Sequence, residues 1–153
     1  MTPENLLKGA VCGLVAGVAA TIAKTVWEDY FPVRHHNTDS PPAVIAQRLT
    51  ERTLTKKEKQ QASMGIHAAF GVGTGVFFGA AAEVAPEVTA GVGLPFGLGF
   101  YGATHGSVVP ALGLEPWPTQ VKRDYAVNEF AGHLVYAVTL EVVRQGVRNY
   151  VVK

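Results

Sequence analysis

The chain has 153 residues, a length typical of one domain, and only 16 % of them are charged, whereas soluble domains average about 25 %. The formal net charge of +1 gives no reason to expect a nucleic-acid partner, and the single cysteine excludes an internal disulfide. Glycine accounts for 17 residues, which is typical of membrane helices.

Two long segments contain no Asp, Glu, Lys or Arg. They are the 23 residues between Lys59 and Glu83 and the 27 residues between Glu87 and Glu115. Crossing the hydrocarbon core of a bilayer takes about 20 mostly apolar residues. The two segments are separated by only a short stretch, so they are predicted to form a membrane hairpin.

We therefore expect an all-α integral membrane protein that forms one domain over residues 1–153, a four-transmembrane-helix bundle in the lipid bilayer. The helices are predicted at about 6–27, 62–82, 89–112 and 126–143. The fourth is interrupted by Glu129 and Glu141, but its 134–140 core is strongly apolar. The polar loop 30–61 follows the first helix. Within it, Ser40 and Pro41 predict the start of a helix capped by the Ser40 hydroxyl, which either lies on the membrane surface or forms a solvated linker.

Glycines at every fourth position mark the predicted packing faces of the first two helices. They are Gly9, Gly13 and Gly17 in the first helix and Gly71, Gly75 and Gly79 in the second. This spacing lets helix backbones approach closely in lipid. Such faces hold a bundle together, and they can also pack against a second copy of the chain or another subunit of a membrane complex.

Four crossings bring the titratable residues of four helices to one side of the membrane. These residues are Lys24, Glu28, His67, His105, Glu129 and His133. At 1.5 Å per residue, the three histidines lie about 7–11 Å below that face. Glu129 and His133 are one helical turn apart, as are Lys24 and Glu28, so each pair shares a helix face. We expect the six side chains to converge in one polar intramembrane site.

The residue types leave several functions open for this site. Histidine changes charge near neutral pH, and Glu/His chains relay protons in membranes, so proton or ion handling is the first hypothesis. The second is a metal or haem site with His67, His105, His133 and Glu129 as candidate ligands. The third is a non-catalytic subunit of a membrane complex. No phosphate-binding loop, nucleophile turn or His-Glu-x-x-His motif occurs, so an enzyme is less expected and no catalytic residue is assigned.

The segment 128–136, of sequence NEFAGHLVY, followed by Glu141 and Arg144, resembles the C-terminal signature of the YagU family (DUF1440) of bacterial inner-membrane proteins. Lys24, Trp27-Glu28, His67, Glu83 with Pro86, and His105 with Pro110 agree in order. The resemblance covers nearly the whole chain outside the loop 30–61. It implies a multi-pass protein of the bacterial inner (cytoplasmic) membrane and supplies no activity.

The membrane orientation receives two opposite predictions. Nine basic residues fall on the loop side of the expected bundle and four on the side of the termini. The positive-inside rule therefore places the loops in the cytoplasm. The family resemblance implies cytoplasmic termini instead, and the basic residues of the loop cluster in one segment that can form a separate surface helix.

Overall fold

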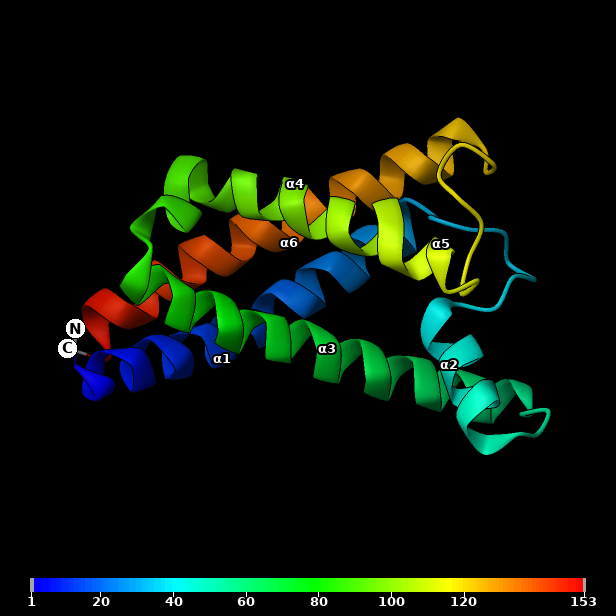
Figure 1. The fold of residues 1–153 in the computed structure, drawn as a ribbon, viewed down its shortest axis with the longest axis horizontal. Helices are drawn as coiled ribbons and strands as arrows, with labels where there is room; N and C mark the ends of the chain where they lie inside the picture. The colour runs from blue at the N-terminus through cyan, green and yellow to red at the C-terminus, as the bar shows by residue number, and fades with distance from the viewer. Residues whose placement is uncertain (1, 153) are drawn as a thin grey trace.

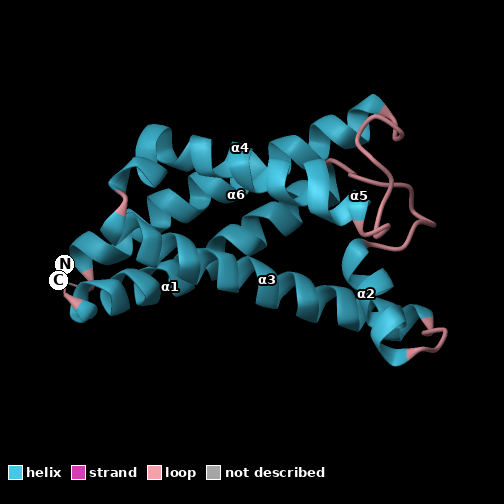
Figure 2. Ribbon diagram, viewed as in Figure 1, coloured by secondary structure: helices cyan, strands magenta, loops and turns pink. Residues whose placement is uncertain are grey.

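A computed structural model describes residues 2–152, which form helices and connecting loops without any strand (Figures 1 and 2). The all-α prediction is thus confirmed for this part of the chain. The elements are α1 (Pro3–Tyr30), α2 (Pro41–Thr50), α3 (Lys56–Val84), η1 (Pro86–Gly93), α4 (Leu94–Ala103), η2 (Thr104–Val108), α5 (Val109–Ala111) and α6 (Arg123–Tyr150). Both termini lie at one end of the bundle, and α2 lies with the long loops at the other (Figure 1). We call these the terminal end and the loop end.

Helices α1 and α3 pack antiparallel through their glycine faces. A Cβ atom on Gly13 would overlap the carbonyl oxygen of Gly75, and a Cβ on Gly79 would overlap that of Gly9. Only glycine permits this approach, because any side chain would push the two backbones apart. Gly71 differs, since a Cβ there would meet the side chain of Thr21 instead of a backbone.

Helix α6 packs antiparallel against α1 and completes the core. The Trp27 indole N–H donates to the carbonyl of Asn128 at 2.9 Å, and a Cβ on Gly132 would lie 3.1 Å from the Trp27 ring. The buried core between α1, α3 and α6 consists of Ala16, Ala20, Phe78, Tyr136 and Leu140. This close packing fixes the axial position of α6 relative to α1.

The third predicted helix, at 89–112, differs most from the structure. Regular helix begins only at Leu94, because Ala90 is extended and Gly91, Val92 and Gly93 have positive φ values of 54°, 55° and 80°. Two glycines in this stretch make such a turn accessible, and Pro95 occupies the first turn of α4. The helix then widens into a π turn at Thr104–Val108 before Pro110, which lacks an N–H for the regular ladder.

The other three long helices extend beyond their predicted bounds. Thr2 caps α1, and α3 begins with a capping box in which Thr55 and Glu58 satisfy each other's backbone N–H groups. Charged residues therefore belong to the ends of these helices. Helices α1 and α3 are each long and apolar enough to cross a membrane, judged by length and composition, which indicates membrane association.

Helix α2 forms where the Ser40-Pro41 pair predicted it, but the expected cap is absent. The Ser40 hydroxyl makes no cap bond and instead shares a 2.5 Å hydrogen bond with the Ser63 hydroxyl of α3. The helix is anchored from another side, because the Arg48 guanidinium donates to the carbonyls of Leu112 and Gly113, each at 2.8 Å. This contact ties the polar loop to the end of α5.

Candidate functional site

All six residues predicted to form a polar site line one cavity of about 460 Å³ at the loop end. Lys24 and Glu28 come from α1, His67 from α3, His105 from η2, and Glu129 and His133 from α6. The structure therefore places these side chains together. Their part in binding or chemistry stays a prediction.

Lys24 is the buried cation of the site, with only 5 % of its surface exposed. Its ammonium group forms an ion pair with Glu28, one turn later on α1, and lies 2.8 Å from Glu129 Oε1. The side chain joins α1 to α6 across the cavity wall. Two carboxylates around one ammonium satisfy its charge, as a buried cation requires.

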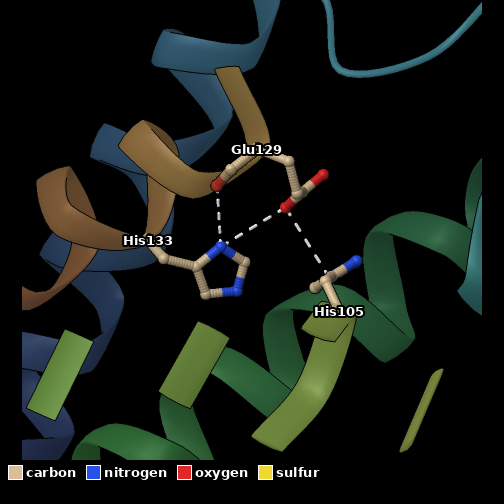
Figure 3. Close-up of side chains that lie close together, drawn as sticks. All are labelled: His105, Glu129 and His133. Atoms are coloured by element: carbon tan, nitrogen blue, oxygen red, sulfur yellow. Dashed lines mark hydrogen bonds and ion pairs between the residues drawn. The ribbon is translucent and has the colours of Figure 1, made fainter. Parts of the chain in front are cut away.

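Glu129 is the centre of the network (Figure 3). Besides Lys24, its Oε1 lies 3.4 Å from His133 Nδ1 and 3.7 Å from His105 Nε2. Its Oε2 lies 3.7 Å from the guanidinium of Arg34. One buried carboxylate thus faces four groups that can carry positive charge, brought by α1, η2, α6 and the loop after α1.

The contacts of the two histidines near Glu129 assign their protons. His133 Nδ1 lies 2.9 Å from the backbone carbonyl of Glu129, which can only accept, so Nδ1 carries the hydrogen. His105 Nδ1 lies 2.5 Å from Glu115 Oε1, so a proton is shared in that contact. The two rings meet edge to face with centroids 5.1 Å apart. The Nε2 atoms of His105 and His133 are the ring nitrogens that remain for proton exchange.

His67 lines the same cavity but stands apart from this network. No hydrogen bond joins its ring to another of the residues 2–152. It lines the cavity from α3. Its ring nitrogens therefore remain available to something entering the cavity.

A second cavity, of about 280 Å³, lies on the outer side of the network and is lined mainly by loop residues. Arg34, His105 and Glu129 line both this outer cleft and the inner cavity. These side chains therefore form the wall between the loop surface and the interior. The inner cavity ends at Tyr136, whose hydroxyl donates to the Gly71 carbonyl at 2.5 Å.

Three residues of this arrangement are missing from the sequence-based prediction. Arg34 was considered only as one of the basic loop residues, and Glu115 only as the end of an uncharged segment. Tyr136 belongs to the C-terminal motif but was not assigned to the site. A signal existed for Tyr136, which lies three residues after His133 and so shares its face of the helix.

A metal ion was one alternative, and the donor set argues against it. Ligand atoms of His105, Glu129 and His133 lie within 4.8 Å of one another. However, the Lys24 ammonium already lies 2.8 Å from the Glu129 oxygen that faces both histidines, and like charges repel. His133 Nδ1 carries a hydrogen, so only Nε2 of this ring could ligate. A cation bound by these three residues would have to displace the Lys24 ammonium from Glu129.

The acidic residues nearer the termini lie outside the site. Glu83 is paired with Arg148 at 2.8 Å and 3.3 Å. Glu141 pairs with Arg144 at 2.7 Å and 2.9 Å. His35 is exposed in the loop, where its ring contacts Tyr125.

The family model "Protein of unknown function (DUF1440)" matches residues 18–142, which include every residue of the network. The chain belongs to the DUF1440 family. No curated protein and no solved structure matches it. The resemblance found in the sequence is thus confirmed. The family description gives no activity, and the function of this DUF1440 chain has to be argued from its site.

Proposed function

We propose that this DUF1440 chain is a multi-pass bacterial inner-membrane protein whose His/Glu network binds protons that enter from the loop end. The observation that carries the proposal is the continuous series of contacts Glu115–His105–Glu129–His133, which separates an outer cleft from an inner cavity. Chains of Glu and His are the usual proton relays of membrane proteins.

Four crossings are supported by length and by the distribution of charge. The helical stretch 94–111 is about 27 Å long at 1.5 Å per residue, close to the roughly 30 Å hydrocarbon core. Helix α6 carries no Asp, Glu, Lys or Arg between Glu129 and Glu141. Large apolar side chains are exposed on the outside of the bundle, among them Val18, Ile22, Phe77, Leu98 and Val142. In a bilayer they would face lipid.

Proton binding is favoured because every group around Glu129 can gain or keep a proton. The cavities beside Glu129 are also lined by Lys24 and Glu28 from α1, Arg34 and Glu115 from the loops, His67 from α3, His105 from η2 and His133 from α6. Histidine is the side chain whose charge ordinarily changes between about pH 5 and 8. A second proton on His105 or His133 would compete with Lys24 for Glu129 and rearrange the contacts.

Access is one-sided in this structure. The Tyr136–Gly71 hydrogen bond and the core side chains Phe78 and Leu140 fill the bundle beyond the cavity. A proton arriving from the outer cleft reaches the network but finds no polar path to the terminal end. We therefore infer a proton-responsive switch at the loop end instead of a pathway that conducts protons across the membrane.

The test uses Trp27 as a reporter in proteoliposomes. Its indole N–H bonds to Asn128, beside Glu129, and its ring contacts Gly132, beside His133. With Trp117 replaced by Phe, Trp27 fluorescence should change as the pH is lowered. His133→Ala should abolish the change, and Glu129→Gln should weaken it because the amide cannot favour the charged imidazole.

The matched control is His36→Ala, which removes an exposed histidine that lines neither cavity. It should leave the fluorescence titration unchanged. If His133→Ala and Glu129→Gln titrate like the parent protein, the proton proposal is wrong. Stoichiometric metal in the purified parent, lost in both variants, would support the metal site instead.

A further inference from the structure

An apolar groove of about 580 Å³ runs along the outside of the bundle between α3 and α4, next to the polar cavity. Its walls are Ala69, Phe70, Gly73, Thr74 and Phe77 from α3 and Phe96, Gly99, Phe100 and Ala103 from α4. Phe70, Phe100 and Ala103 line both the groove and the polar cavity, so they form the boundary between the two spaces. The apolar groove and the polar cavity therefore lie side by side, and together they form one lateral feature.

The feature opens sideways, toward the surroundings of the bundle. Phe70 and Phe77 at the groove are 56 % and 68 % exposed, and Val108 and Leu112 at the mouth of the cavity are 54 % and 58 % exposed. A Cβ on Gly73 or on Gly99 would meet no atom within 4 Å. Helices α3 and α4 thus leave an open channel at their surface, next to the acyl chains in a four-helix membrane protein.

The polar end offers hydrogen-bond donors that contacts within the described chain do not fully use. The carboxylates of Glu28 and Glu129 are engaged by Lys24. The Arg34 guanidinium has a single 3.7 Å contact with Glu129, and the His67 ring has no hydrogen bond to the described part of the chain. Guanidinium and imidazole groups with spare N–H bonds are suited to phosphate oxygens.

We propose that one anionic phospholipid of the bilayer binds here, with an acyl chain in the groove and its phosphate at Arg34 and His67. The two parts lie in the right order, because phosphate belongs near a membrane face and acyl chains run inward from it. His67 and Phe77 are ten residues apart on α3, which gives the chain about 15 Å of apolar wall. The proposal rests on the membrane placement argued above but not on proton binding.

The first experiment measures lipid retained by the full-length protein, purified in mild detergent, by native mass spectrometry. The parent should carry one anionic phospholipid. Gly73→Leu places a side chain in the groove, where its Cβ would meet no atom within 4 Å, and should lower lipid occupancy at least about fivefold, the change that goes with roughly 1 kcal/mol. Gly65→Leu is the control, because it also adds a side chain to open space on α3 but lies outside both cavities.

The second experiment tests the headgroup in nanodiscs that contain anionic and zwitterionic phospholipids with the same acyl chains. The parent should retain the anionic lipid preferentially, and Arg34→Gln should reduce that preference while Gly65→Leu keeps it. Equal retention of both lipids by the parent, or equal occupancy in Gly73→Leu and Gly65→Leu, would overturn the proposal. A lipid-free dimer that Gly73→Leu converts to monomer would show that a second copy fills the groove.

The outcome is separable from that of the proton proposal. Gly73→Leu changes none of the groups around Glu129, so the Trp27 titration should persist when the lipid is lost. A parent that binds lipid but shows no pH response would contradict only the proton switch. A parent with the pH response but no bound lipid would contradict only the lipid site.

Discussion

The loop end and the terminal end of the bundle both bury charged groups, but they satisfy them differently. At the terminal end Glu141 and Glu83 each have their own arginine, with two hydrogen bonds from Arg144 to Glu141 and two from Arg148 to Glu83. At the loop end the single carboxylate of Glu129 contacts Lys24, Arg34, His105 and His133.

This difference separates a structural use of buried charge from a responsive one. Bidentate arginine pairs are geometrically fixed and their charges do not change near neutral pH. A carboxylate shared among lysine, arginine and two imidazoles can redistribute its contacts when one imidazole is protonated. The cavities next to Glu129 leave room for such a rearrangement, whereas the residues around Glu141 leave none, since Glu141 is 0 % exposed.

The largest loss of stability is expected from breaking the Glu141–Arg144 pair at the terminal end. Arg144→Ala would leave the Glu141 charge buried without a cation, with only the Gln145 amide donating to it, and such a loss costs about 3–5 kcal/mol in comparable proteins. Thermal unfolding in detergent should show a large loss of stability, while the Trp27 fluorescence titration of the surviving folded protein stays like that of the parent.

Two further variants control this experiment. Arg148→Ala should cost much less, because the Arg148–Glu83 pair is partly exposed. Replacing Glu141 and Arg144 together by leucine should recover most of the stability lost in Arg144→Ala. If Arg144→Ala lowers the stability no more than Arg148→Ala does, the view that the Glu141–Arg144 pair is structural is contradicted.

The next largest loss of stability is expected at the glycine contact between α1 and α3 near the terminal end. Gly79→Ala adds a Cβ that overlaps the Gly9 carbonyl, so α1 and α3 must separate, at a cost of about 1–3 kcal/mol for an overpacked contact. Gly146→Ala is the matched control, since its Cβ would meet nothing within 4 Å and alanine favours helix over glycine. Equal unfolding temperatures for the two variants would argue against close glycine packing.

The sequence predicted the components of the loop end well. Charge-free segments located the long helices, and the four-residue spacing of Glu129 and His133 placed both on one face of α6. The antiparallel order of the helices brought Lys24 and His67 to the same end of the bundle. These inferences hold because they depend on helix geometry alone, which is independent of tertiary detail.

The remaining features depend on contacts that spacing does not encode. Arg34 and Glu115 reach the network because of how two loops fold, and loop paths are set by tertiary contacts such as Arg48 with the carbonyls of Leu112 and Gly113. The break before Leu94 was missed because the segment is uniformly apolar, so hydrophobicity predicted a continuous span. Its glycines and Pro95 were the available signal.

A smaller effect is expected where the two ends meet, at Tyr136. Tyr136→Phe removes the hydrogen bond to Gly71 and should lower stability by about 1 kcal/mol, but the ring still closes the cavity. Tyr136→Ala removes the ring as well and should let protons leak across proteoliposomes that are tight with the parent protein. A pH-sensitive dye inside the vesicles measures the leak.

Tyr101→Phe controls this experiment, because the Tyr101 ring packs on His133 while its hydroxyl makes no hydrogen bond to residues 2–152. It should change neither stability nor leak. Parent vesicles that already conduct protons through the protein would contradict one-sided access.

The smallest effect on folding is expected from the exposed Arg52–Glu58 pair at the loop end, outside the proposed membrane-spanning part of α3. Hydrogen bonds from the Arg52 guanidinium, and then from the backbone and hydroxyl of Thr55, lower the pKa of Glu58 to about 2 from its usual 4.5. Because the folded-state pKa is the lower one, ionised Glu58 favours the folded state above about pH 4.5, and this contribution disappears as the pH falls through about 2.

Thr55→Val should raise the pKa of Glu58 part-way, since the backbone bond remains, and Arg52→Gln should raise it further. Carbon NMR titration of the labelled Glu58 carboxyl measures both shifts, and the Trp27 titration should be unchanged in both variants. A Glu58 titration that stays near pH 2 in Arg52→Gln would show that this pair is not what holds the carboxylate ionised.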